Sequence, residues 1–294
     1  MQISPPQYRR IAVGGLVSLA IIIVSGAAVR LTNSGLGCDD WPRCNSTKLI
    51  DVSSKHAAIE QINRLFTGVV GVAVIIAVLA SLVRVPRRRD LTALSWWLVA
   101  GVVANALIGG VSVKVHLHPM VIQSHLLLSM ALIVVGTVLV RRAGEPDGAV
   151  LRSAVTEPTK HLTRVLFGLT CVAVFTGTIV TGAGPHAGDE DAERLNVSIP
   201  AVARLHGIAV MLAIAVALVI AWRIRKHAED QRALANVIST WILVGMLQAV
   251  VGYIQYFNEV PALLVGIHVA GATAVMLVST LVVLDTRAVE VAVT

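Results

Sequence analysis

The chain has 294 residues, of which 56% are hydrophobic and only 14% are charged. A soluble domain carries about 25% charged residues, so this composition excludes an ordinary soluble fold and indicates an integral membrane protein. The net charge of +7 does not indicate nucleic-acid binding, because the basic residues lie in short groups between apolar stretches. We therefore expect a protein that contacts membrane lipid and binds no nucleic acid.

Eight uncharged apolar stretches follow one another, each close to the roughly 20 residues that a helix needs to cross a bilayer. The second and the sixth are short and should begin a turn earlier, which places Glu60, Asn63 and Arg204 on helices. The predicted fold class is an all-α integral membrane protein with eight transmembrane helices. The spans are residues 11–29, 65–83, 91–113, 119–140, 165–183, 205–222, 235–257 and 260–284.

Basic clusters lie in every second loop, on the side that also holds both termini. On the opposite side, the loop after the third span has only Lys114, and the loop after the seventh has no basic residue. The loop after the fifth span carries the acidic run 189–191 together with Glu193. The positive-inside rule then places both termini in the cytoplasm. The first span is too long for a signal peptide, and residues 1–10 do not suit a mitochondrial transit sequence, so we expect a bacterial cell membrane.

The chain divides into two similar halves near residues 144–159, a stretch with glycine, proline and charge. IGGVSVKVHLHPMVIQSH in the first half parallels VGYIQYFNEVPALLVGIH in the second. His125 follows Gly110 by 15 residues, and His268 follows Gly252 by 16. We predict two pseudo-symmetric four-helix bundles, residues 1–145 and 158–294, each able to enclose a cofactor between its helices.

Three histidines and one asparagine lie at matching depths in the second, fourth, sixth and eighth spans, and these residues are Asn63, His125, His206 and His268. At about 1.5 Å per residue, the side chains lie roughly 6–10 Å below the outer ends of the spans. An imidazole buried in a membrane is costly without a partner, and two facing imidazoles can hold a haem iron from both sides. We predict that His206 and His268 face one iron, and that His125 faces Asn63.

Other readings of the histidines and cysteines stay open at this point. The imidazoles of His206 and His268 could instead bond the backbone, and zinc or copper also accepts two imidazoles, although no third ligand is expected at that depth. Cys38 and Cys44 lie in the outer loop GLGCDDWPRC, where a disulfide is expected and free thiols or a metal site are the alternatives. Cys171 lies within a span and is expected to pack in the interior.

Several charged residues lie near the outer membrane boundary. Glu60 is either stabilised there by the helix dipole, or serves as a general base or charge stabiliser beside a substrate. Arg30, Arg64 and Arg204 either reach the lipid phosphates or bind the propionates of a haem. His186, in GAGPHAG, is the loop histidine for which a role is left open.

Together these residues resemble the heme A synthase family. The resemblance covers nearly the whole chain and rests on RLTNSGLGCDDWPRC after the first span, IEQINR at the second, TGAGPHAG after the fifth and RLH in the sixth. The pattern RLTxSGLxCxDWPxC is specific because it joins glycine turns, a cysteine pair and Trp-Pro in one loop. Cys38 and Cys44 match the outer-loop cysteine pair of the family.

The resemblance implies that a methyl substituent of haem O is oxidised to a formyl group, giving haem A for cytochrome oxidase assembly. It implies a haem b cofactor whose iron lies between His206 and His268, and a substrate haem with His125 as an axial ligand. Glu60 matches the candidate catalytic carboxylate of the family. A haem O synthase and an electron-transfer protein are the expected partners, and homo-oligomerisation is left open.

Asn63 departs from the family motif Glu-x-x-His-Arg, which reads EQINR here. An amide is a poor iron ligand beside imidazole, but it can form hydrogen bonds to water or to an oxygenated ligand. We expect the substrate haem to be held by His125 alone or with a weak distal ligand, with Arg64 nearby. Arg204 is expected to bind the haem b cofactor.

Two other classes of function are alternatives. One is a b-type cytochrome that relays electrons between quinol and an outer acceptor, and the other is a haem transporter. Glu60 and the single histidine of the first half favour synthesis, because histidine pairs in both halves would favour a relay. No span has the Gly/Pro-broken middle that is typical of transporters.

Overall fold

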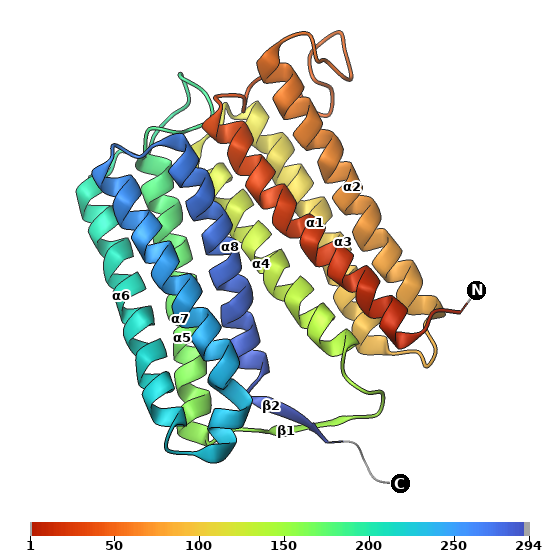
Figure 1. The fold of residues 1–294 in the computed structure, drawn as a ribbon. Coiled ribbons are helices and arrows are strands. Elements are labelled where there is room, and N and C mark those ends of the chain that lie inside the picture. Colours follow the sequence, from red (N-terminus) through yellow and green to blue (C-terminus); the bar gives the residue numbers. More distant parts are fainter. Residues whose placement is uncertain (1, 291–294) are drawn as a thin grey trace.

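The computed structural model describes residues 2–290 and is dominated by long helices that run alongside one another (Figure 1). Helix α1 begins and helix α8 ends at the end of the molecule where a short sheet lies. The elements are α1 (Pro5–Leu31), α2 (Lys55–Val83), α3 (Arg89–Lys114), α4 (Pro119–Ala143), β1 (Val150–Ser153), α5 (Glu157–Ala183), α6 (Ile199–Ile224), α7 (Ala228–Phe257), α8 (Ala262–Leu284) and β2 (Arg287–Glu290).

The eight predicted spans are confirmed, since eight helices within the described residues are long and apolar enough to cross a membrane. Helix α2 begins at Lys55, well before the apolar stretch, because the Ser54 hydroxyl accepts a hydrogen bond from the Ala57 N–H (3.1 Å) and caps the helix. Glu60 and Asn63 therefore lie on the helix, as predicted. Arg204 lies on α6, because this helix also begins before its predicted apolar stretch, at Ile199.

Helices α1, α2, α5, α6 and α7 begin before the predicted apolar spans. Two further details differ from the sequence predictions. The eighth span is predicted from residue 260, but Glu259 and Val260 have left-handed φ values of 60° and 58°, so α8 begins after Pro261. The linker between the halves contains β1, which pairs antiparallel with β2. Strands of four residues are too short to leave a clear alternation in the sequence, so this sheet is not predicted from it.

The helices pack in two rings. Each of α1 to α4 contacts two neighbours, in the order α1, α2, α3, α4 and back to α1, and α5 to α8 do the same. Helix α8 joins the rings by contacting α1 and α4, and α4 also contacts α5. The boundaries 1–145 and 158–294 and the pseudo-twofold relation stay predictions.

Each ring has an apolar interior. Leu98 and Ile133 are fully buried in the first ring, and Leu166, Ile220 and Ile238 are fully buried in the second. Many large apolar side chains on the outer faces of the helices are exposed, as expected where lipid surrounds the protein. The eight helices thus use apolar side chains on both sides, which is why the chain contains so few charges.

The turns between α3 and α4 and between α7 and α8 have the same backbone geometry. His116 and Leu117 have φ values of 50° and 60°, which match those of Glu259 and Val260. In both turns, the N–H of the second residue donates to the carbonyl five residues earlier, at 2.8 Å. Because the two turns have the same backbone geometry, α4 and α8 begin in similar orientations. His125 and His268, which follow on these helices, therefore have similar positions.

Ion pairs gather at the end of the molecule that carries the basic clusters. Arg84 is fully buried and forms an ion pair with Asp147 (2.8 Å), which ties the α2–α3 loop to the linker. The buried Asp230 carboxylate of α7 accepts hydrogen bonds from Thr156 and Thr159 at the start of α5. These contacts fix the linker against both rings.

Candidate functional site

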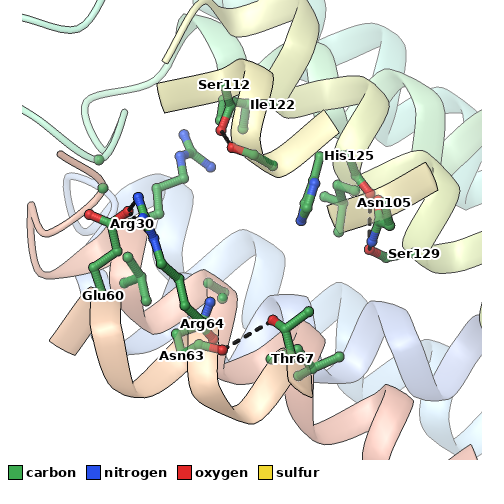
Figure 2. A pocket seen from close by; sticks show the side chains of 18 of the residues that line it. Arg30, Glu60, Asn63, Arg64, Thr67, Asn105, Ser112, Ile122, His125 and Ser129 are labelled. Carbon is green, nitrogen blue, oxygen red and sulfur yellow. Dashed lines mark hydrogen bonds and ion pairs between the residues drawn. The ribbon is translucent and has the colours of Figure 1, made fainter. Parts of the chain in front are cut away.

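A cavity of about 570 Å³ opens inside the first ring, toward the end of the molecule opposite β1 and β2. Its size lies within the range of about 300–1,000 Å³ that is common for small-molecule sites. Figure 2 shows Arg30, Glu60 and Asn63 on the wall formed by α1 and α2, and His125 and Asn105 on the facing wall. The cavity brings together most of the first-half residues singled out from the sequence.

The second ring also contributes to this cavity. Thr178, Thr181 and Gly182 near the end of α5 line it, as does Val269 of α8. The backbone of the first outer loop is held to the loop after α5, because the Gly35 N–H donates to a carbonyl of that loop at 2.9 Å. The cavity is therefore completed at the junction of the two rings.

His125 projects from α4 into the cavity (Figure 2). Its Nδ1 is buried and forms no hydrogen bond of normal geometry within residues 2–290, although the Asn105 backbone lies beside it. Two residues before it, the Gln123 Nε2 is buried and has no partner in that range. An unpaired buried polar group costs about 1–3 kcal/mol, so such atoms indicate a place where a ligand or water completes the structure.

Asn63 lies across the cavity from His125 (Figure 2). Its Oδ1 accepts a hydrogen bond from the Ser25 hydroxyl of α1 at 2.8 Å. The Nδ2 of an amide has no free lone pair and can only donate. Asn63 thus offers an N–H donor and a carbonyl oxygen at this place, which differs in chemistry from a second imidazole.

The Glu60 carboxylate is buried, with 5% of the residue exposed, and both of its oxygens have partners. Oε1 accepts from Arg64 Nε (3.0 Å) and Nη2 (2.5 Å), and Oε2 accepts from the Cys38 N–H (2.7 Å). Arg64 Nη1 donates in turn to the carbonyls of Asp40 (2.9 Å) and Arg43 (3.0 Å). Glu60 and Arg64 line the cavity and at the same time fasten the outer loop to α2.

The predicted disulfide between Cys38 and Cys44 is confirmed, and both residues are buried against Ala57 of α2. Asp40 of the same loop accepts a hydrogen bond from Lys114, and this contact holds the pKa of the Asp40 carboxyl below its usual value. Trp41 lines the cavity and packs on Gly110, where a Cβ would come within 2.5 Å of the indole. The loop thereby forms part of the outer wall of the cavity.

His206 and His268 lie together in the second ring, with ring centres 6.3 Å apart and planes at 74°. The Nδ1–H of His206 donates to the Ala173 carbonyl at 2.9 Å, so its Nε2 carries the free lone pair. The Nδ1 of His268 has no partner within the described residues. No group of three or more histidine, cysteine or acidic side chains that could hold a metal ion is found there either.

Each of the three histidines packs against a glycine of the preceding helix. The pairs are Gly109 with His125, Gly177 with His206 and Gly252 with His268, where a Cβ on the glycine would lie 3.2, 3.1 and 3.1 Å from the ring Cε1. Gly109, and not Gly110, is therefore the counterpart of Gly252, and both spacings to the histidine are 16 residues. The glycines leave room for the rings at the helix contact.

A protein-family comparison covers most of the chain. The sequence matches the model of the COX15-CtaA family, described as cytochrome oxidase assembly proteins, over residues 9–281. The chain belongs to this family. With its eight helices, this member of the family is a multi-pass membrane protein.

Three relatives carry the name heme A synthase. The protein from Bacillus mycoides is 28% identical over 267 residues, which is 86% of this chain and 84% of the relative. The protein from Exiguobacterium sibiricum is 29% identical over 174 residues, 57% of each chain. The protein from Lysinibacillus sphaericus is 32% identical over 103 residues, so that alignment spans about a third of either chain.

For some of the site residues predicted from the sequence, no contact links them to the cavity of the first ring or to the histidine pair of the second ring. Arg204 is exposed on α6 and forms no hydrogen bond or ion pair within residues 2–290. His186 donates from Nε2 to the Val260 carbonyl (2.8 Å), which links its loop to the α7–α8 turn. Cys171 packs partly buried against the interior of the first ring, which fits the packing role expected for it.

The structure adds residues that sequence reasoning did not single out for the cavity. Asn105, Gln123 and Ser25 lie on apolar helices and bring polar groups to the cavity or to its asparagine. The sequence offered one signal for them: each is a polar side chain within an apolar span, close to the depth of the histidines. Serine and asparagine also occur in spans for packing, so that signal alone does not select them.

Proposed function

We propose that this protein is a haem A synthase, which oxidises a methyl substituent of haem O to a formyl group. The observation that carries the proposal is the inequality of the two histidine sites. Two imidazoles lie close together in the second ring, whereas a single imidazole lies across an open cavity from an amide in the first. A permanent cofactor suits the former, and a substrate that enters and leaves suits the latter. The names of the relatives support the same reaction.

The second ring suits a haem held from both sides. An imidazole nitrogen lies about 2 Å from a bound metal and about 1 Å from its own ring centre, so two opposed imidazoles have centres about 6 Å apart. The ring centres of His206 and His268 lie 6.3 Å apart, which agrees with this value. A bound haem would bring its own nitrogen ligands, so His206 and His268 would be sufficient to hold it. We propose haem b here, with Arg204 near its propionates.

The bound haem b would supply one-electron redox chemistry. The residues of this chain hold it in place: the Ala173 carbonyl orients the His206 ring through Nδ1 and leaves Nε2 free to bind iron. Gly177 and Gly252 allow both rings to lie close to the helices that support them. Gln248 donates to the His268 carbonyl at 2.7 Å and so steadies α8 at this level.

In the first ring, we propose that His125 binds the iron of the substrate haem and that Asn63 supplies a hydrogen-bond donor on the opposite side. Because the Ser25 hydroxyl occupies Asn63 Oδ1, the amide keeps a fixed orientation. Glu60 is proposed as the catalytic carboxylate that holds or takes up a proton at Oε1 or Oε2 beside the substrate. Arg64 and the Cys38 N–H fix the position of that carboxylate.

We further propose that the protein lies in a bacterial cell membrane with both termini in the cytoplasm. The basic residues at the end where α1 begins and α8 ends support this orientation, including Arg84, Arg88 and Arg141. The cavity then opens near the outer surface, where the disulfide is stable.

The proposal is tested by producing the protein with a haem O synthase in cells that lack haem A, then extracting the haems and separating them by chromatography. We expect haem A in the extract. Unchanged haem O beside a fully loaded protein would contradict the synthase and favour an electron relay or a transporter.

Glu60→Gln and Arg64→Gln form a matched pair in the same assay, because each removes one partner of the same ion pair. If Glu60 acts on the proton, Glu60→Gln lowers haem A formation about 100-fold, in line with general acid–base catalysis. Arg64→Gln lowers it much less, because the carboxylate and its hydrogen bond from the Cys38 N–H remain. Equal losses in the two variants would show that Glu60 only fastens the outer loop.

His206→Ala and His268→Ala test the cofactor site by absorption and electron paramagnetic resonance spectroscopy. Each variant should lose the low-spin signal of a haem with two imidazole ligands, because one axial ligand is removed. His125→Ala is the control and should keep that signal. A low-spin signal that survives in His206→Ala would refute the pairing.

A further inference from the structure

Arg30 lies in the last turn of α1 and lines the cavity beside the junction of the two rings. Its Nη2 donates to the Thr181 carbonyl at 2.7 Å, in the last turn of α5. Its Nε is buried and has no partner within the described residues. Most of the donors of this guanidinium are therefore unused by the protein itself.

The charge of Arg30 also lacks a counter-ion, since no carboxylate of the described residues lies within 4.0 Å of it. The other arginines of the interior differ: Arg64 is paired with Glu60 and Arg84 with Asp147. The negative end of α5 compensates the Arg30 charge only in part. A cation in a membrane protein normally has a partner, so this one is suited to an anion that arrives from outside the chain.

A second unpaired donor lies beside the same end of α5. The buried Gln123 Nε2 packs on Gly182, where a Cβ would lie 2.7 Å from it, and Gly182 follows the residue that Arg30 contacts. Arg30 from α1 and Gln123 from α4 thus meet α5 at adjacent residues. Two donors from different helices converge there, and both line the cavity.

We propose that Arg30 and Gln123 form a carboxylate-binding subsite at the outer end of the cavity, which recognises an acidic group of an otherwise apolar substrate. Deeper in the cavity the lining is apolar, with Leu19, Val102 and Leu132. A flat amphiphile would place its carboxylate on Arg30 and its apolar body toward these residues. This subsite rests on the proposed function in one respect: for haem O the acidic group is a propionate.

Arg30 rather than Arg64 carries this role because of the bonds that each already makes. Arg64 uses Nε, Nη1 and Nη2 on Glu60 and on two loop carbonyls. A substrate carboxylate could bind Arg64 only by displacing one of these partners. Arg30 can bind it with no such loss, and its planar guanidinium suits a carboxylate.

The test is a spectroscopic titration of the purified, haem b-loaded protein with haem O and with its dimethyl ester, in which both propionates are blocked. The unmodified protein should bind haem O at least about tenfold more tightly than the ester, as expected for a hydrogen bond to a charged group. Arg30→Gln should abolish this preference while leaving the ester affinity unchanged. Lys55→Gln is the control, because it removes an exposed charge at the start of α2 that does not line the cavity.

An unchanged preference for the acid over the ester in Arg30→Gln would overturn the subsite, whatever happens to activity. Thermal unfolding of the haem O-free protein gives a second readout. Removal of an unpaired buried charge should leave the Tm unchanged or raise it, whereas a purely structural link to Thr181 predicts a fall. Gln123→Leu should lower the preference by a smaller factor, about threefold to tenfold, and serves if Arg30→Gln does not fold.

The outcome separates this inference from the proposed reaction. Formation of haem A together with an unchanged acid preference in Arg30→Gln refutes the subsite alone. If Arg30→Gln loses that preference and the unmodified protein forms no haem A, the subsite is upheld and the synthase is refuted.

Discussion

At the scale of single residues, the two rings differ most at a pair of equivalent positions. Asn63 and His206 are 143 positions apart, as are His125 and His268. His206 is oriented by a backbone carbonyl through Nδ1, whereas Asn63 is oriented by the Ser25 hydroxyl. The two positions therefore differ in chemistry, because the first ring offers an amide where the second offers an imidazole.

Asn63→His tests whether this difference sets the coordination of the substrate. We expect the unmodified protein loaded with haem O to show one low-spin haem with two imidazoles, and the variant to show two, because the new imidazole faces His125. Electron paramagnetic resonance of the loaded protein distinguishes the two states. Asn63→Gln, which keeps an amide, should behave like the unmodified protein.

Two low-spin haems with paired imidazoles in the unmodified protein would contradict single-imidazole binding of the substrate. The ligand opposite His125 would then have to come from another residue of the cavity.

At the scale of helices, contacts between glycine and histidine determine how close neighbouring helices lie. The rings of His206 and His268 lie against Gly177 and Gly252, with no space for a methyl group at normal contact distance. The sequence indicates a repeat through its prolines and glycines, but it does not show which of two adjacent glycines faces the ring. That choice depends on the rotation of α3 about its axis, which packing decides.

Gly252→Ala tests the role of this close contact. A Cβ would lie 3.1 Å from His268 Cε1, which is tight enough to push the ring away from its place. We expect a lower content of bound haem b and a shifted low-spin signal, measured by haem extraction and spectroscopy. Gly207→Ala is the matched control, since it lies next to His206 with no atom within 4 Å of the added Cβ. Equal haem contents in both variants would contradict the prediction.

The predicted ends of the helices show where sequence reasoning is strong and where it is weak. Apolar runs locate all eight helices, because the bilayer demands length and hydrophobicity. They do not locate the first turns, which carry polar residues such as Lys55 and Glu60 on α2. The cap at Ser54 decides that boundary, and it brings Glu60 to the Cys38 N–H.

At the scale of the whole molecule, the cavity of the first ring depends on the second. Thr181 and Gly182 of α5 complete its lining, and Arg30 crosses the junction to reach Thr181. Helices α4 and α8 bring the rings together at this level. A substrate in the cavity would therefore lie against parts of both halves.

Gly182→Ala tests this dependence. The added Cβ would lie 2.7 Å from Gln123 Nε2, so the flexible glutamine must move toward the cavity. We expect haem O to bind about threefold to tenfold more weakly, because the hydrogen bond from Gln123 is weakened but not removed, and we expect an unchanged signal from haem b bound in the second ring. Gly168→Ala on the same helix has no atom within 4 Å of its Cβ and should change neither.

The amino-acid sequence by itself determined the eight helices, the cysteine pair and the positions of three histidines and Asn63 along the helices, and it predicts a division into two similar halves. These features follow from hydrophobicity, proline and glycine signals and counted spacing, which are local properties of the chain. Only the tertiary structure decided that Glu60 and Arg64 hold the outer loop, that Ser25 orients Asn63, and that Arg30 is left without a counter-ion. Such contacts join residues far apart in the sequence, and they depend on the rotation of each helix and on how the two rings pack.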